Sequence, residues 1–263
     1  MKIRVISGLV MVPILFGILY FGGPVLAGAC FLIAVIGVSE FFSGFENMGV
    51  KPSKIIAYIA AILLYLINVL ELPFSTYMLW FFISVLLPML YMFKINERKL
   101  EDGIATMTGI FYVVFFSYHI LLVSQLERYS LLVWLVFFSA FGSDIMAYFT
   151  GYLIGKHKLC PNLSPKKTVE GAVGGLLGGA IACGIFGLLF LKPILPHCLI
   201  MGASAAAFSQ IGDLTASLFK RKMGIKDYGE LIPGHGGIMD RFDSILFTAP
   251  FIYYYAVFVI GAV

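Results

Sequence analysis

Acidic side chains are concentrated in one short stretch of this chain, between positions 213 and 244. Asp213 comes first, and Asp240 and Asp243 follow with i, i+3 spacing, which places the last two on neighbouring faces of one helical turn. Carboxylate oxygens are the ligands that hard divalent cations such as Mg²⁺ require. Three carboxylates can support one ion or two, and two ions can activate an attacking oxygen and neutralise a leaving one.

Basic side chains are interleaved with these carboxylates and predict a site for an anion. They are Lys220, Arg221, Lys222, Lys226, His235 and Arg241, and the preceding cytoplasmic loop adds Lys166 and Lys167. Arg offers bidentate hydrogen bonds to phosphate, and Lys offers a mobile point charge. The run from Pro233 to Gly237 has little bulk, so its backbone N–H groups, and those at the start of the next helix, are expected to reach phosphate oxygens. A positive belt that only sets membrane topology is the alternative, but it leaves the interleaved carboxylates and glycines unexplained.

The elements that carry these residues are predicted to be membrane-spanning helices. The chain has 263 residues, of which 60% are hydrophobic and 12% are charged, and its mean hydropathy is +0.98. A spanning helix needs about 20 mostly apolar residues, and continuous rather than alternating runs favour helices over a barrel. We predict an all-α, polytopic membrane helix bundle with about nine transmembrane helices. The apolar runs are 3–22, 25–43, 55–71, 76–93, 105–123, 130–152, 171–191, 196–219 and 240–262.

The distribution of Lys and Arg predicts the orientation of these helices, because short cytoplasmic loops collect basic residues. With the N-terminus in the cytoplasm and the C-terminus outside, all of the 18 Lys and Arg residues except Arg128 and Lys192 face the cytoplasm. The first apolar run superficially resembles a signal peptide. A second run follows it directly, so we expect a retained first helix.

We predict a single integral membrane domain over 1–263, with a helical scaffold in 1–140 and a catalytic part in 141–263. Ionisable groups are almost absent from the spans of the scaffold; Glu40 and His119 are exceptions that belong to no motif. In the catalytic part, Asp144 is expected near mid-membrane and Asp213 about 10 Å below the cytoplasmic surface. An unpaired carboxylate at such depth is costly, so each is expected to face a wet cavity, a cation or a basic partner.

Glycines give the run 171–191 one flat helix face. They form two interleaved G-x-x-x-G patterns, at Gly171, Gly174, Gly175, Gly178 and Gly179. Such a face lets another helix approach closely, and we expect helix packing there, with the floor of a substrate groove as the alternative. The packing helix could come from the same chain or from a second copy, so a homodimer is left open.

Motifs within residues 140–244 resemble those of a known family. The main signature comprises Ser217, Lys220-Arg221, Lys226-Asp227, Pro233-Gly234-His235-Gly236-Gly237 and Asp240-Arg241-Phe242-Asp243. Two upstream segments, Asp144 to Tyr148 and Ser164 to Gly171, match two further motifs, although Val169 stands where Trp is often found. Together these segments closely resemble the phosphatidate cytidylyltransferase family, also called CDP-diacylglycerol synthases.

The resemblance implies a nucleotidyltransferase of phospholipid biosynthesis, which converts CTP and phosphatidic acid to CDP-diacylglycerol and pyrophosphate with Mg²⁺. No protein nucleophile is needed, because positioning and charge neutralisation can carry such a transfer. The number of Mg²⁺ ions, one or two, and an additional monovalent cation are left open. The expected partners are CTP and phosphatidic acid in the bilayer, without nucleic acid. The expected location is a bacterial cytoplasmic (inner) membrane, with the active site facing the cytoplasm.

The resemblance also assigns roles to the candidate residues. Asp213, Asp240 and Asp243 are expected to hold metal, and together with Lys226 and Arg241 they form the catalytic set. Substrate binding is assigned to Lys166, Lys167, Thr168, Ser217, Lys220, Arg221, Asp227, Gly234, His235, Gly236, Gly237 and Asp144.

Two other functions compete with this assignment. A CTP-dependent polyprenol or phytol kinase would transfer the γ-phosphoryl group of CTP, using similar cation and nucleotide contacts. An ion-coupled transporter would use the intramembrane carboxylates to carry ions. The charged groups gather on one side of the predicted bundle, which argues against a transport path.

Overall fold

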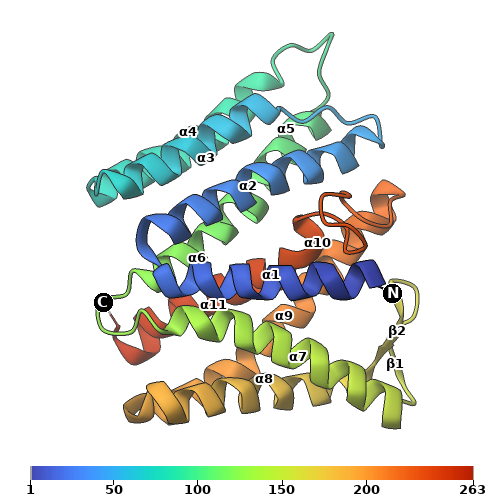
Figure 1. Cartoon of the computed structure of the whole chain (residues 1–263). Coiled ribbons are helices and arrows are strands. Elements are labelled where there is room, and N and C mark those ends of the chain that lie inside the picture. Colours follow the sequence, from blue (N-terminus) through green and yellow to red (C-terminus); the bar gives the residue numbers. More distant parts are fainter. Residues whose placement is uncertain (1, 263) are drawn as a thin grey trace. The chain divides into compact units, whose positions relative to one another are not determined.

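The computed structural model describes residues 2–262 of the chain, with side chains from Ser7 onward (Figure 1). Helices make up most of these residues, which confirms the predicted all-α class. The chain divides into two compact units. Of the described residues, the first unit comprises 2–118 and 222–241, and the second comprises 119–221 and 242–262.

Six helices within residues 2–262 are long and apolar enough to cross a membrane, which supports an integral membrane protein. They are Gly23–Glu46, Phe74–Tyr91, Leu100–Ser124, Leu132–Ile154, Val169–Phe190 and Lys192–Met223. Three shorter apolar helices cover the other predicted runs, at Ser7–Phe21, Lys54–Val69 and Ile245–Ile260. Each predicted run therefore contains a helix, whereas the number of spans and their orientation stay predictions.

The first unit is built around α2. Its helices are α1 (Lys2–Phe21), α2 (Gly23–Glu46), α3 (Lys54–Val69), α4 (Phe74–Tyr91), α5 (Leu100–Thr108), a π-helical segment (Gly109–Phe115) and the start of α6 (Phe116–Ser124). α2 contacts α3, α5 and the π-helical segment, and its residues Val38, Phe41 and Phe42 are fully buried. Figure 1 shows α3 and α4 side by side. The segment 222–241, with most of α10 (Met239–Phe242), completes this unit.

The second unit is organised by α7 (Leu132–Ile154) and α8 (Val169–Phe190), which pack side by side (Figure 1). A hairpin of two short strands, β1 (Lys158–Cys160) and β2 (Ser164–Thr168), joins them. A single 3₁₀ turn (Lys192–Ile194) then leads into α9 (Leu195–Met223). α11 (Ile245–Tyr255) contacts α7 and continues as a π-helical turn (Ala256–Ile260).

The glycine face of α8 packs against helices of its own unit. A Cβ added at Gly178 would overlap the carbonyl oxygen of Gly142 in α7. A Cβ added at Gly179 would lie 2.5 Å from the carbonyl oxygen of Gly202 in α9. The expected helix packing is confirmed, and for these glycines the partner helices belong to the same chain.

Local structure near the site differs from the prediction in three places. The hairpin was not predicted, since three-residue and five-residue strands leave no clear periodicity. α9 continues to Met223 rather than ending at 219, because Lys and Arg are good helix formers even where an apolar run stops. The run 240–262 is interrupted by a turn at Asp243 and Ser244. There Asp243 Oδ1 accepts the Ser244 N–H at 2.7 Å, a local bond that competes with the helix.

Candidate active site

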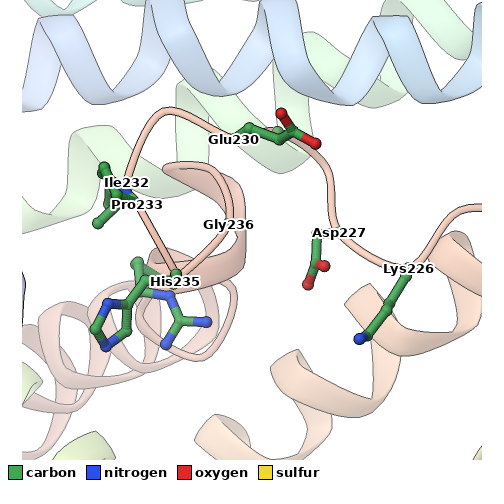
Figure 2. Close-up of a pocket in the computed structure, with 10 residues that line it drawn as sticks. Lys226, Asp227, Glu230, Ile232, Pro233, His235 and Gly236 are labelled. Atoms are coloured by element: carbon green, nitrogen blue, oxygen red, sulfur yellow. The ribbon is translucent and has the colours of Figure 1, made fainter. Parts of the chain in front are cut away.

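Residues 222–241 of the first unit, called the signature segment from here on, line a polar cavity of about 600 Å³ (Figure 2). Its lining residues are Lys226, Asp227, Gly229, Glu230, Ile232, Pro233, Gly234, His235, Gly236 and Arg241. Figure 2 shows Lys226 and Asp227 on one side of the cavity and His235 on the other. A volume of this size is typical of small-ligand sites. The predicted site residues that share this cavity are Lys226, Asp227, Gly234, His235, Gly236 and Arg241.

A tight turn presents His235 at this cavity. The Ile232 N–H donates to the Gly236 carbonyl at 2.8 Å, and the His235 N–H donates to the Ile232 carbonyl at 2.9 Å. Gly234 and Gly236 have φ values of +77° and +86°, which side-chain-bearing residues rarely adopt. Within the described chain, the His235 Nδ1 atom is buried and has no hydrogen-bond partner.

Backbone N–H groups of residues 233–237 and of the start of the next helix were expected to reach phosphate, but those of Gly237, Ile238 and Met239 already have carboxylate acceptors. Asp240 Oδ2 accepts the N–H groups of Tyr228, at 2.8 Å, and Gly237, at 3.0 Å. Glu40 accepts the N–H groups of Ile238, at 3.1 Å, and Met239, at 2.9 Å. Buried N–H groups require partners, and in this structure carboxylates of the chain supply them. Anion binding in the cavity thus depends more on its side chains.

Helices α1 and α2 contribute side chains that the motif analysis did not assign to the site. Glu40 of α2 bonds the segment directly, and the Ser7 hydroxyl of α1 donates to the Pro233 carbonyl at 2.9 Å. Glu40 lies between Gly37 and Gly44 on one helix face, and that pattern was the available signal. Neither residue belongs to a motif, so spacing within the signature could not identify them.

In the second unit, Asp213 of α9 forms an ion pair with Lys167 of β2. The two side chains are about one-third exposed, at 32% and 28%. Asp213 was expected to have a basic partner, a cation or water, and Lys167 is that basic partner. The ion pair thereby joins a predicted substrate-binding residue of the hairpin to a predicted metal ligand of α9.

Asp243 lies in the turn before α11 and is buried. Burial and the nearby Asp213 carboxylate raise the pKa of Asp243 to about 7, while Lys220 opposes the shift. Asp144 of α7 adds a further negative charge that acts in the same direction. Three of the predicted acidic residues therefore influence one another within the second unit.

This carboxylate group fits a divalent cation only in part. Among residues 2–262, no group of three or more His, Cys, Asp or Glu side chains is arranged to hold a metal ion. Mg²⁺, however, often takes only one or two carboxylates and completes its shell with water and substrate phosphates. Burial and repulsion raise the pKa of Asp243, and a cation beside Asp213 and Asp243 would relieve the repulsion. Asp240 differs, because its Oδ2 atom holds the signature segment.

The remaining predicted residues of the hairpin and α9 have more varied settings. Thr168 is buried, and its hydroxyl accepts the Gly171 N–H at 3.1 Å, which caps α8. Its structural role is therefore clear, whereas its role in substrate binding stays a prediction. Lys166 and Arg221 are exposed, and Ser217 is partly exposed.

Comparisons with known proteins agree with the motif resemblance. The chain matches the model of the cytidylyltransferase family over residues 2–259. It is 31% identical to a phosphatidate cytidylyltransferase of Synechocystis sp., over 97% of this chain and 96% of that protein. The corresponding Staphylococcus epidermidis enzyme is 32% identical over 95% and 96%. The Bacillus subtilis enzyme is 40% identical over 59% and 58%. The chain therefore belongs to the cytidylyltransferase family of membrane nucleotidyltransferases.

Proposed function

We propose that the chain transfers the cytidylyl group of CTP to phosphatidic acid, giving CDP-diacylglycerol and pyrophosphate for phospholipid biosynthesis. The observation that carries this proposal is the polar cavity of the signature segment, with Lys226, His235 and Arg241 in its lining. These side chains suit phosphate groups, which both substrates carry. The relatives named above are phosphatidate cytidylyltransferases, and two of them align over nearly their full length.

In the proposed reaction, an oxygen of the phosphatidate phosphate attacks the α-phosphorus of CTP. A new P–O bond forms as the bond between the α-phosphorus and its bridging oxygen breaks, and pyrophosphate leaves. Lys226, Arg241 and His235 would hold phosphate oxygens and stabilise the charge that develops on them. Lys167, which contacts Asp213, would meet a phosphate once a cation shares that carboxylate.

Mg²⁺ would neutralise phosphate charge in this reaction. Asp213 and Asp243 would hold the ion, and Asp240 lies three residues before Asp243 in the sequence. Phosphatidic acid is retained in the bilayer, whereas CTP arrives from water, so the site is expected at a membrane surface. We propose the cytoplasmic surface of a bacterial inner membrane, because nearly all basic residues fall on that side of the predicted topology.

Labelled CTP tests this proposal. Purified protein in nanodiscs that contain phosphatidic acid is given Mg²⁺ and CTP labelled at either the α- or the γ-phosphate. We expect the α-label in lipid and the γ-label in pyrophosphate. Label from the γ-phosphate in lipid would instead indicate a kinase, and absence of both labels from lipid would contradict the proposal.

Replacing Arg241 tests the role of the cavity. Arg241→Met is expected to lower kcat/KM roughly 10- to 100-fold, because a hydrogen bond to a charged group contributes about 1.5–3 kcal/mol. The matched control is Arg128→Met, which removes an Arg that stacks on the Tyr129 ring and lies outside the cavity lining. Equal activity of both variants would remove the cavity from the mechanism.

A further inference from the structure

One face of α2 supports the whole signature segment of the first unit. This face consists of Gly37, Glu40, Phe41 and Gly44, which follow the i, i+3, i+4, i+7 spacing of a single helix face. A Cβ at Gly37 would lie 3.2 Å from the Met239 sulfur, and a Cβ at Gly44 would lie 2.5 Å from the Met223 sulfur. Between them, the Tyr228 and Phe41 rings pack with their centroids 6.0 Å apart. The segment thus contacts α2 near both of its ends and in its middle.

Glu40 provides the polar contact of this face. Its Oε1 accepts the Ile238 N–H and its Oε2 accepts the Met239 N–H, so both carboxylate oxygens are used. Gly229 and Gly237 also approach this carboxylate closely. A Cβ at Gly229 would lie 2.6 Å from Oε1, and one at Gly237 would overlap the carboxylate. Two glycines therefore give the segment its close fit around one side chain.

The two residues whose N–H groups bind Glu40 lie immediately before residues of the proposed active site. Ile238 and Met239 precede Asp240 and Arg241 in the sequence, and Arg241 lines the cavity. Asp240 binds the Gly237 N–H, so two carboxylates fix consecutive backbone groups of the segment. Bonds between charged and backbone groups are among the stronger hydrogen bonds in proteins. Removing Glu40 would leave two N–H groups without their acceptor and release the start of α10 from α2.

We propose that Glu40 is a positioning residue for the cytidylyl transfer. It holds the signature segment in its reactive geometry without touching substrate. This inference rests on the proposed function. Positioning matters because a displacement of about 1 Å at a reacting group can lower a rate roughly 100-fold.

The kinetic test compares three variants of α2. Glu40→Ala is expected to lower kcat/KM about 10- to 100-fold. Glu40→Gln keeps one acceptor oxygen and is expected to retain several times the activity of Glu40→Ala. Glu46→Ala is the matched control, because Glu46 lies on the same helix and pairs with Lys54 at 3.0 Å, away from the segment. Wild-type activity in Glu40→Ala, or no higher activity in Glu40→Gln, would overturn the proposal.

Hydrogen exchange separates this inference from the proposed function. Exchange of peptides spanning 229–242 is measured by mass spectrometry without substrate. We expect faster exchange in Glu40→Ala and unchanged exchange in Glu46→Ala. Unchanged exchange in Glu40→Ala would overturn the positioning role even if the wild type is active. A wild type that makes no CDP-lipid would contradict the proposed function, whatever the exchange result.

A double-mutant cycle with Gly237→Ala provides a second test. The new methyl group would displace the Glu40 carboxylate and weaken its bonds to Ile238 and Met239. Gly237→Ala is therefore expected to lower kcat/KM by a similar factor, and adding Glu40→Ala should lower it little further. Multiplicative losses in the double variant would show that the two positions act independently, and this would overturn the shared role.

Discussion

Among single residues, Asp213 and Asp243 show most clearly what a cation would do in this protein. Burial and mutual repulsion raise the pKa of Asp243, and Lys167 already supplies a positive charge to Asp213. The predicted site residues include Asp213, Asp243 and Lys167, but the motifs do not predict the ion pair or the repulsion between these side chains. The structure also separates the roles of the carboxylates. Asp240 accepts a backbone N–H group, whereas Asp243 is buried beside another carboxylate that helps to raise its pKa.

Replacing Asp243 is expected to remove metal-dependent stabilisation. We expect Mg²⁺ to raise the Tm of the wild type, since a ligand at 100 times its Kd stabilises the folded state by about 2.7 kcal/mol. Asp243→Asn should lose most of this rise, because the amide carries no charge for the cation. Without Mg²⁺, Asp243→Asn should be no less stable than the wild type, since it removes a buried charge beside Asp213. Thermal unfolding in detergent, with and without MgCl₂, measures both effects.

The control for this prediction is Glu46→Gln, an exposed position on α2 that should keep the full Mg²⁺ response. A Mg²⁺-dependent rise in Tm that is equal in Asp243→Asn and the wild type would exclude Asp243 as a metal ligand.

At the scale of elements, the packing of α7, α8 and α9 determines where the second group of site residues lies. These helices carry Asp144 and Asp213, and the hairpin between α7 and α8 carries Lys167. Gln210 of α9 connects all three helices, since its Nε2 donates to the Ala172 carbonyl at 3.0 Å and lies 3.3 Å from Ser143 Oγ. Glu170 fixes the start of the hairpin by accepting the N–H groups of Lys156 and His157.

A methyl group in the α7–α8 contact should destabilise the protein. Gly178→Ala places a Cβ against the Gly142 carbonyl, so backbone must move, and overpacking of this kind costs about 1–3 kcal/mol. Gly28→Ala in α2 is the matched control, because its Cβ would meet nothing within 4 Å. The control should be neutral or slightly stabilising, since Ala favours helix more than Gly does.

Thermal unfolding of the two glycine variants in detergent measures this difference. A Tm of Gly178→Ala equal to that of Gly28→Ala would show that the α7–α8 contact is looser than the structure indicates.

At the scale of the whole molecule, the distribution of charge predicts how the chain lies in the membrane. The positive-inside pattern predicts that Lys222 faces the cytoplasm and Arg128 faces outside. In a Cys160→Ser background, Arg128→Cys should react with an impermeant maleimide added outside intact cells, and Lys222→Cys should react only after the cells are opened. Cys30, Cys183 and Cys198 are buried and are expected to react slowly.

Labelling of both new cysteines from outside, or of Lys222→Cys alone, would contradict the predicted orientation. Either result would also move the proposed CTP site away from the cytoplasm, since both conclusions rest on the same distribution of charge.

The sequence by itself determined the all-α membrane class and where the apolar helices lie along the chain, and it predicted the segment that carries the chemistry. Apolar runs, glycine spacing and motifs are properties of contiguous residues, so they can be interpreted without knowing which helices meet. Charge distribution predicted an orientation on the same basis.

Only the tertiary structure decided which side chains act on one another. Glu40 and Ile238 are 198 residues apart, and no local pattern predicts that their hydrogen bond shapes the signature segment. Likewise, the pairing of Lys167 with Asp213 depends on a hairpin too short to leave a periodic signal. The physical reason is that these contacts follow from how helices and loops pack, and packing depends on the complementarity of distant surfaces rather than on local sequence.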